Sequence, residues 1–286
     1  MSEAADRRRE ALRRMAADDP ELAARLVLMV LPAAAARIRD TLAFELRVAE
    51  LGDYRVSVAD GAARVDPGGG EGHVDFRLST DATALVDLVT GAARPFRLML
   101  GGRLRIRGKR RRALKLRAMG SEAPDIQEVV RSGGQLDPDI LYRALPYLVE
   151  PEWTKGHKFA IRYEISGQNG GTWFVEARDG EPLRVTTESP GNGAVTSTVK
   201  VPQEAYQRMA AGELSPNKAM QDRVTQVEGQ LFPITLVGRW IDRSQGRDDA
   251  ELKREAKQRR IQRKRAGMWG ASANGAGPGQ GDPGHA

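Results

Sequence analysis

Basic side chains dominate the stretch from Arg97 to Arg117, which holds ten Lys and Arg residues and no acidic residue. Around Leu104 and Ile106, arginines alternate with apolar residues, the two-residue period of a strand that has one basic and one apolar face. Such a basic face can contact phosphate groups, including those of an anionic bilayer surface. The residues expected to make these contacts are Arg103, Arg105, Arg107, Lys109 and Arg110. The alternative is an ordinary solvated strand face.

Residue types that could bind a metal or catalyse a reaction are scarce in the rest of the sequence. The chain has no cysteine, and its three histidines, His73, His157 and His285, are far apart in the sequence. Asp60 and Asp179 each precede a glycine, where a carboxylate usually caps a turn. The sequence contains no phosphate-binding glycine loop and no Ser-His-Asp arrangement. We therefore expect no metal site, no cofactor and no catalytic group.

The elements that would position these residues occur twice, at an offset of about 120 residues. One set of five residues recurs at an offset of 121: Gly91, Pro95, Met99, Ile106 and Gly108 are matched by Gly212, Pro216, Met220, Val227 and Gly229. The Asp60-Gly61 pair recurs as Asp179-Gly180 at an offset of 119. A repeat of this length indicates a duplicated globular domain, since solenoid periods run at roughly 20 to 50 residues.

Within each copy the hydrophobic period changes in the same order. In the first copy, Phe44 to Val48 and Tyr54 to Val58 alternate as half-buried strands, and Asp60-Gly61 predicts the turn that follows. A further strand is expected around residues 74–78, then an amphipathic helix that ends at Gly91. The last strand is expected at residues 104–106, or 224–227 in the second copy. The pattern predicts an α+β fold with a mostly antiparallel sheet covered by helices.

This order, followed by Gly-x-x-x-Pro and then Met99-Leu-Gly101-Gly-Arg-Leu104-Arg-Ile106-Arg-Gly108, resembles the sterol carrier protein type two lipid-transfer domain. The tract runs from Gly91 to Gly108 in the first copy and from Gly212 to Gly229 in the second, where Asp222 replaces a family glycine. The resemblance covers residues 22–119 and 136–243. It implies a five-stranded sheet whose helices enclose an apolar tunnel, which takes up sterols, fatty acyl chains or acyl-CoA esters.

The residues expected to line the two tunnels follow from that resemblance and are apolar. In the first copy they are Leu85, Leu88, Phe96, Met99, Leu100, Leu104 and Ile106. In the second copy they are Tyr206, Met209, Met220, Val224, Val227 and Phe232. The basic stretch would then lie at a tunnel mouth, close to a bilayer or to the phosphates of acyl-CoA. The alternative is that these apolar residues simply fill a core.

The remaining segments set the domain boundaries. We predict a charged N-terminal segment over residues 1–21, domains at 22–119 and 136–245, and a linker at 120–135. A helix is expected to start at Pro20, after Asp18 and Asp19. Residues 246–286 are predicted to form a disordered tail, first basic and then rich in Gly and Pro. Because no apolar leader precedes residue 14 and no apolar run reaches about 20 residues, a cytoplasmic protein without a membrane span is expected.

Two other functions remain open at this stage. One is an adaptor without a ligand that uses the duplicated fold as an interaction platform. The other is nonspecific binding of nucleic acid through the arginine-rich stretches, which the sequence pI of about 9.8 favours. No nucleic-acid motif is present, so no specific nucleic-acid partner is expected. The sequence fixes neither the lipid nor the oligomeric state.

Overall fold

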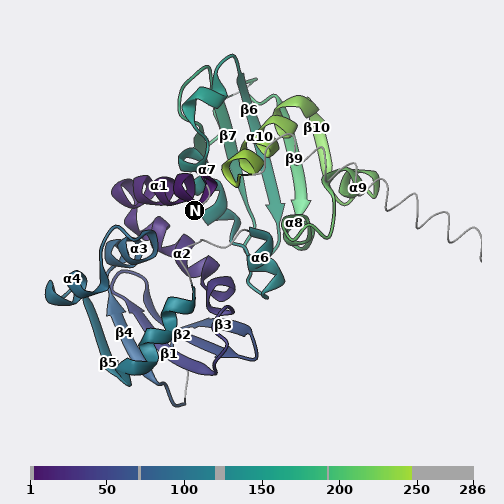
Figure 1. The fold of residues 1–286 in the computed structure, drawn as a ribbon. Coiled ribbons are helices and arrows are strands. Elements are labelled where there is room, and N and C mark those ends of the chain that lie inside the picture. Colours follow the sequence, from purple (N-terminus) through teal and green to yellow (C-terminus); the bar gives the residue numbers. More distant parts are fainter. Residues whose placement is uncertain (1–2, 70–71, 120–125, 192, 247–286) are drawn as a thin grey trace, which may run out of the picture. The chain divides into compact units, whose positions relative to one another are not determined.

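A computed structural model describes residues 3–69, 72–119, 126–191 and 193–246, and these contain two five-stranded sheets (Figure 1). The first sheet has the order β3-β2-β1-β4-β5, formed by β1 (Leu42–Val48), β2 (Gly52–Ala59), β3 (Ala62–Pro67), β4 (Phe76–Thr80) and β5 (Leu104–Gly108). The second has the order β10-β9-β6-β7-β8, formed by β6 (Lys158–Ser166), β7 (Gly171–Arg178), β8 (Arg184–Thr186), β9 (Ser197–Pro202) and β10 (Gln226–Gly229). In each sheet one central pair is parallel, β1 with β4 and β6 with β9, and the other pairs are antiparallel. The identical order confirms the duplicated α+β fold.

Helices precede, interrupt and follow the strands of each sheet. Before and within the first sheet lie α1 (Glu3–Asp18), α2 (Pro20–Ala35), α3 (Ala82–Thr90) and α4 (Pro95–Leu100). After it come α5 (Arg110–Ala113), the 3-10 helix η1 (Leu114–Met119) and α6 (Ile126–Arg131). The second sheet is accompanied by α7 (Pro138–Leu148), the 3-10 helix η2 (Pro151–Thr154), α8 (Gln203–Ala210), α9 (Pro216–Gln221) and α10 (Leu231–Ser244). By order along the chain, α7, α8 and α9 are the counterparts of α2, α3 and α4.

Helix α2 begins where the sequence predicts. Pro20 occupies its first turn, and the Asp19 carboxylate accepts a hydrogen bond from the backbone N–H of Leu22 at 2.9 Å. The segment before it, expected only to be charged, is the helix α1, whose Ala5, Ala11 and Met15 are buried. Sequence reasoning missed this helix because two of its three buried side chains are alanines, which give a weak apolar stripe.

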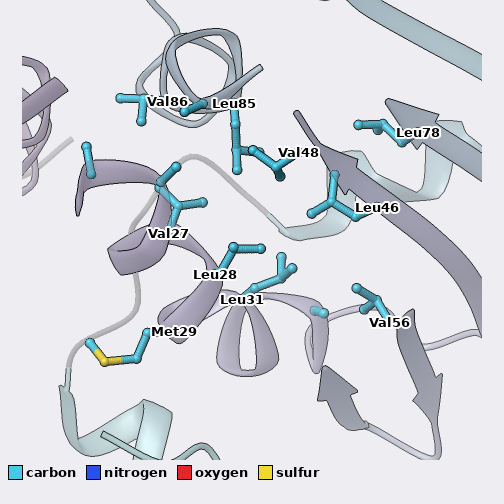
Figure 2. Close-up of a cluster of buried hydrophobic side chains, with 14 of the residues drawn as sticks. Val27, Leu28, Met29, Leu31, Leu46, Val48, Val56, Leu78, Leu85 and Val86 are labelled. Atoms are coloured by element: carbon cyan, nitrogen blue, oxygen red, sulfur yellow. The ribbon is translucent and has the colours of Figure 1, made fainter. Parts of the chain in front are cut away.

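The core of the first sheet lies between one of its faces and the helices α2 and α3. Figure 2 shows Leu28 and Leu31 of α2 near Leu46 and Val56 of the sheet, with α3 contributing Leu85 to the same cluster. Across the parallel pair the rings of Phe44 and Phe76 stack, with centroids 5.0 Å apart. The strand alternation predicted for Phe44 to Val48 is therefore confirmed.

The other face of the first sheet is charged. Arg77 contacts Glu45 on the neighbouring strand at 2.7 Å, and Arg47 contacts Asp53 at 2.6 Å. Arg105 and Arg107 of the edge strand β5 pair in register with Ser79 and Arg77, which places them on this same face. The first sheet is thus apolar toward its helices and polar on its other face.

The core of the second sheet is richer in aromatic side chains. Tyr142 of α7 stacks on Trp173 of β7 and lies against Tyr163 of β6, both at 5.0 Å between ring centroids. The indole Nε1 of Trp173 donates a hydrogen bond to Asp139 at 3.1 Å, which satisfies its buried polar group. Trp240 of α10 is buried on the same cluster.

Two turns contain residues with positive φ. Asp60 and Gly61 both have positive φ, 52° and 74°, as a tight hairpin turn requires. After α4, Gly102 has a φ of 73°, and its counterpart in the second copy is Arg223, with a φ of 55°. The last strand of that copy begins at Gln226, two residues later than predicted. Of the predicted tail, 246–286, all but Gly246 lies outside the described residues, as do residues 120–125 of the proposed linker, 120–135. The described part of that linker contains the helix α6.

Candidate functional site

Four of the predicted tunnel residues in the first copy gather beneath α3. Leu85 of α3 and Leu104 of β5 are buried, and Leu88 and Ile106 are half-buried against the same cluster. Leu85 and Leu88 come from the apolar face of α3, and Leu104 and Ile106 are alternate residues of β5. All four side chains belong to, or pack against, the same hydrophobic cluster.

The other three residues predicted for this tunnel lie on the surface. Phe96, Met99 and Leu100 of α4 are 65%, 42% and 74% exposed. Their spacing puts them on one side of the short helix, while Leu98, which the sequence reasoning did not select, is the buried member. In this structure the three exposed side chains enclose no space.

In the second copy, too, some of the predicted tunnel residues are half-buried and others are exposed. Tyr206, Met209, Met220 and Val227 are half-buried. Val224 and Phe232 are 36% and 60% exposed. The ring of Phe232 lies 6.0 Å from that of His157, which in turn lies 6.0 Å from Trp240.

Three phenols in the second copy form a cluster, of which sequence reasoning selected Tyr206 but missed Tyr142 and Tyr163. Burial raises the pKa of Tyr142, Tyr163 and Tyr206 above the ordinary value of 10.0, so each phenol is neutral at physiological pH. Trp173 stacks beside Tyr142. The available signal was the apolar face of α7, where Tyr142 precedes Leu145 by three residues. The second copy thus has an aromatic cluster, whereas the predicted tunnel residues that are buried in the first copy, Leu85 and Leu104, are aliphatic.

The five basic residues predicted to contact anions fall into two groups. Arg103 is held by Asp81 at 2.6 Å and by Asp87 at 3.7 Å, and Lys109 contacts Asp75 at 3.3 Å. Arg105, Arg107 and Arg110 are exposed and form no ion pair with any residue in the described part of the chain. Only the second group has its charge available for a partner.

Asp75 is the buried carboxylate of this region. It accepts hydrogen bonds from Arg112 and Lys109, and from the backbone N–H of Ala43. Burial alone would raise the pKa of Asp75, but these donors outweigh burial and lower it below 3.8. The group stays ionised and joins the start of β4 to α5. Its role is structural.

A surface pocket of about 330 Å³ lies apart from the predicted tunnels, lined by Arg37, Ile38, Arg39, Asp40, Leu114 and Lys115. None of these residues was predicted to bind a ligand. Within the described ranges, no three His, Cys, Asp or Glu side chains gather as metal ligands would. No helix in the same ranges has the length and hydropathy needed to cross a bilayer.

Comparison with solved structures finds sterol carrier domains and an enzyme. Sterol carrier protein 2 from Yarrowia lipolytica, in its apo form, is 12% identical, with 34% of this chain and 90% of that chain covered and a TM-score of 0.27. The sterol carrier protein domain 2 of Helicoverpa armigera is 18% identical, with 41% and 98% covered and a TM-score of 0.29. The sec-alkylsulfatase Pisa1 from Pseudomonas sp. is 18% identical, with 44% of this chain but 19% of that chain covered and a TM-score of 0.32. With TM-scores this low, these superpositions carry no argument about function.

The comparison with protein families covers more of the chain than these superpositions do. The SCP-2 sterol transfer family matches this chain twice, over residues 25–119 and over residues 147–236. Comparison with curated proteins gave no match. The two matched stretches span the two sheets, which share one strand order. The chain therefore belongs to the SCP-2 sterol transfer family, with the family's domain present twice.

Proposed function

We propose that this chain is a non-catalytic lipid carrier that takes up sterol, fatty acyl or acyl-CoA ligands in an apolar tunnel. The observation that carries the proposal is the double match to the SCP-2 sterol transfer family, a family with a lipid-binding role. The tunnel of the first copy is assigned to Leu85, Leu88, Leu104 and Ile106. That of the second is assigned to Tyr206, Met209, Met220 and Val227.

The energetics of such a site need no polar group. Burial of a methylene contributes about 0.8 kcal/mol, so an acyl chain of about ten carbons supplies the roughly 8 kcal/mol of micromolar binding. A cavity lined by apolar side chains stays dry and accepts hydrocarbon. The thioethers of Met209 and Met220 add adaptability to ligand shape in the second copy.

The setting of the carrier belongs to the same proposal. We retain the domain boundaries 22–119 and 136–245, a cytoplasmic location, and exchange of lipid with an anionic membrane surface. The exposed cations Arg105, Arg107 and Arg110 support the last point, because each basic residue near an anionic surface contributes about 1 kcal/mol of attraction.

Matched tunnel-filling variants test the proposal. Ile106 and Val227 occupy the same place in the two copies, and both are half-buried. Ile106→Trp is expected to abolish uptake of a fluorescent fatty acid by the first copy, and Val227→Trp uptake by the second. Isothermal titration of the fatty acid into each variant, and into the parent chain for comparison, then measures which copy binds. Each substitution fills only its own tunnel.

Two controls keep the result interpretable. Circular dichroism establishes that each variant is folded, and Ile106→Phe, a smaller filling, is expected to weaken binding less than Ile106→Trp. Should the parent chain bind no fatty acid, acyl-CoA or sterol, the carrier proposal fails and the adaptor function takes its place. Should both Trp variants stay folded and bind as the parent does, the assigned tunnels are wrong.

A further inference from the structure

The outer side of α4 is the most exposed apolar surface of the first copy. Three large side chains, Phe96, Met99 and Leu100, face solvent from a helix of six residues. Burial of apolar surface contributes about 25 cal/mol per Å². These exposed side chains therefore do not provide the stabilisation that their burial would give. Clusters of this kind mark interaction sites more often than single exposed residues do.

The second copy shows that the fold does not require this surface. Helix α9 is the counterpart of α4, is also six residues long, and buries Ala219 where α4 buries Leu98. At the places of Phe96 and Leu100 it carries Asn217 and Gln221. The same element therefore forms with polar side chains on its outer side. Phe96 and Leu100 are therefore specific to the first copy, whereas Met99 is matched by the half-buried Met220.

The charge around α4 indicates what covers it. Arg94 precedes the helix, Arg97 lies within it, and Arg105 and Arg107 follow on β5. All four are exposed, and none forms an ion pair with a residue in the described ranges. The nearby carboxylates of Asp81 and Asp87 are neutralised by Arg103. The apolar side chains of α4 are thus flanked in the sequence by exposed arginines that have no ion pair in the described ranges.

In the second copy this charge is missing. Ser215, Gln226 and Glu228 stand at the places of Arg94, Arg105 and Arg107. Lys218, the counterpart of Arg97, is held by Asp222 at 2.8 Å, and Glu228 contacts Lys200 at 3.0 Å. At the positions of Phe96, Leu100 and the four arginines, the first copy thus carries apolar side chains and cations without an ion pair, whereas the counterparts in the second copy are polar, acidic or ion-paired.

We propose that α4 is the membrane-docking element of this protein: Phe96, Met99 and Leu100 insert at the headgroup boundary of an anionic bilayer, while Arg94, Arg97, Arg105 and Arg107 contact lipid phosphates. Apolar insertion combined with electrostatic attraction is the mode by which interfacial helices bind membranes. This inference deepens the proposed carrier function and rests on it, since it names the surface that would receive or deliver lipid. It also makes the two copies unequal, because only the first docks.

The test exchanges residues of the first copy for their counterparts in the second. Phe96→Asn with Leu100→Gln, made in the full chain, is expected to lower partitioning onto phosphatidylserine-containing vesicles by about tenfold or more in a sedimentation assay. Arg105→Gln with Arg107→Glu is expected to lower binding to those vesicles and to leave the weak binding to phosphatidylcholine vesicles unchanged. All four side chains are exposed, so the fold is retained.

The control is another exposed apolar pair, Leu231 and Phe232, which are 55% and 60% exposed at the start of α10. Leu231→Gln with Phe232→Asn is expected to leave vesicle binding unchanged. The proposal is overturned if the α4 variant binds vesicles as the parent does, or if both apolar pairs contribute equally. Uptake of monomeric fatty acid without vesicles is measured in parallel. Loss of docking with uptake intact supports the proposal, whereas absence of uptake in the parent chain removes the carrier function instead.

Discussion

Asp75 shows how a single buried charge holds the first sheet in place. It is 6% exposed and lies between β4 and the segment that follows β5, where Arg112, Lys109 and the backbone of Ala43 surround it. Its counterpart in the second copy is Thr196, whose hydroxyl donates to the carbonyl of Ala160 at 2.8 Å. The same junction is thus fixed by an ionic network in one copy and by a neutral hydrogen bond in the other.

This difference predicts a pH-dependent stability. Since the folded-state pKa of Asp75 lies below 3.8, its contribution is present above that value and is lost as pH falls through the folded-state pKa. Asp75→Asn is expected to lower the free energy of unfolding by about 1 to 2 kcal/mol at pH 7, and by progressively less below about pH 4. Urea denaturation across this pH range measures the effect.

The matched control for Asp75 is Asp66, which pairs with Arg64 at 2.6 Å on the exposed strand β3. An exposed pair contributes about 0 to 1 kcal/mol, so Asp66→Asn is expected to change the unfolding free energy little at any pH. A loss in Asp75→Asn that is independent of pH would contradict the ionic account of this junction.

At the level of single elements, the turn that follows α4 and the turn that follows α9 have the same backbone conformation but a different residue type. Gly102 adopts a left-handed backbone in the first copy, and Arg223 adopts the same conformation in the second. A side chain makes this conformation unfavourable by roughly 1 to 2 kcal/mol, whereas glycine adopts it freely. An added Cβ at Gly102 would meet no heavy atom within 4 Å, so the effect of a substitution there comes from the backbone.

Reciprocal exchanges at this turn should have opposite signs. Gly102→Ala is expected to destabilise the chain by about 1 kcal/mol, and Arg223→Gly to stabilise it by a similar amount. Differential scanning calorimetry of the two variants is the measurement. If both substitutions shifted the melting temperature in the same direction, backbone strain would not explain the difference between the copies.

Periodicity predicted some elements and missed others for physical reasons. The first two strands, the Asp60-Gly61 turn and the start of α2 at Pro20 are confirmed, because each depends on local sequence. The helix α10 was not predicted, although its buried Pro233, Val237 and Trp240 recur at helical spacing. In α4, a helix of six residues, periodicity could not identify which side is covered by the rest of the fold. Residues assigned to a tunnel from the family resemblance therefore include three residues of α4 that the structure exposes, and Val224 and Phe232 of the second copy are exposed as well.

At the scale of the whole molecule, a duplicated domain allows its two copies to diverge. The first copy has an exposed apolar helix and arginines without an ion pair in the described ranges. The second has an aromatic cluster with three neutral phenols, and a more polar α9. Both copies share one strand order, and both match the SCP-2 sterol transfer family. We expect the two copies to have different roles, with membrane contact made by the first copy.

The central claim is that the chain carries lipid, and native mass spectrometry of the purified full-length protein tests it most directly. We expect a mass increase that corresponds to one or two acyl or sterol molecules per chain. Solvent extraction should remove this increase, and added ligand should restore it. Loss of one ligand in Ile106→Trp or Val227→Trp would assign it to a copy. A clean ligand-free mass that does not shift with added fatty acid, acyl-CoA or sterol would contradict the account.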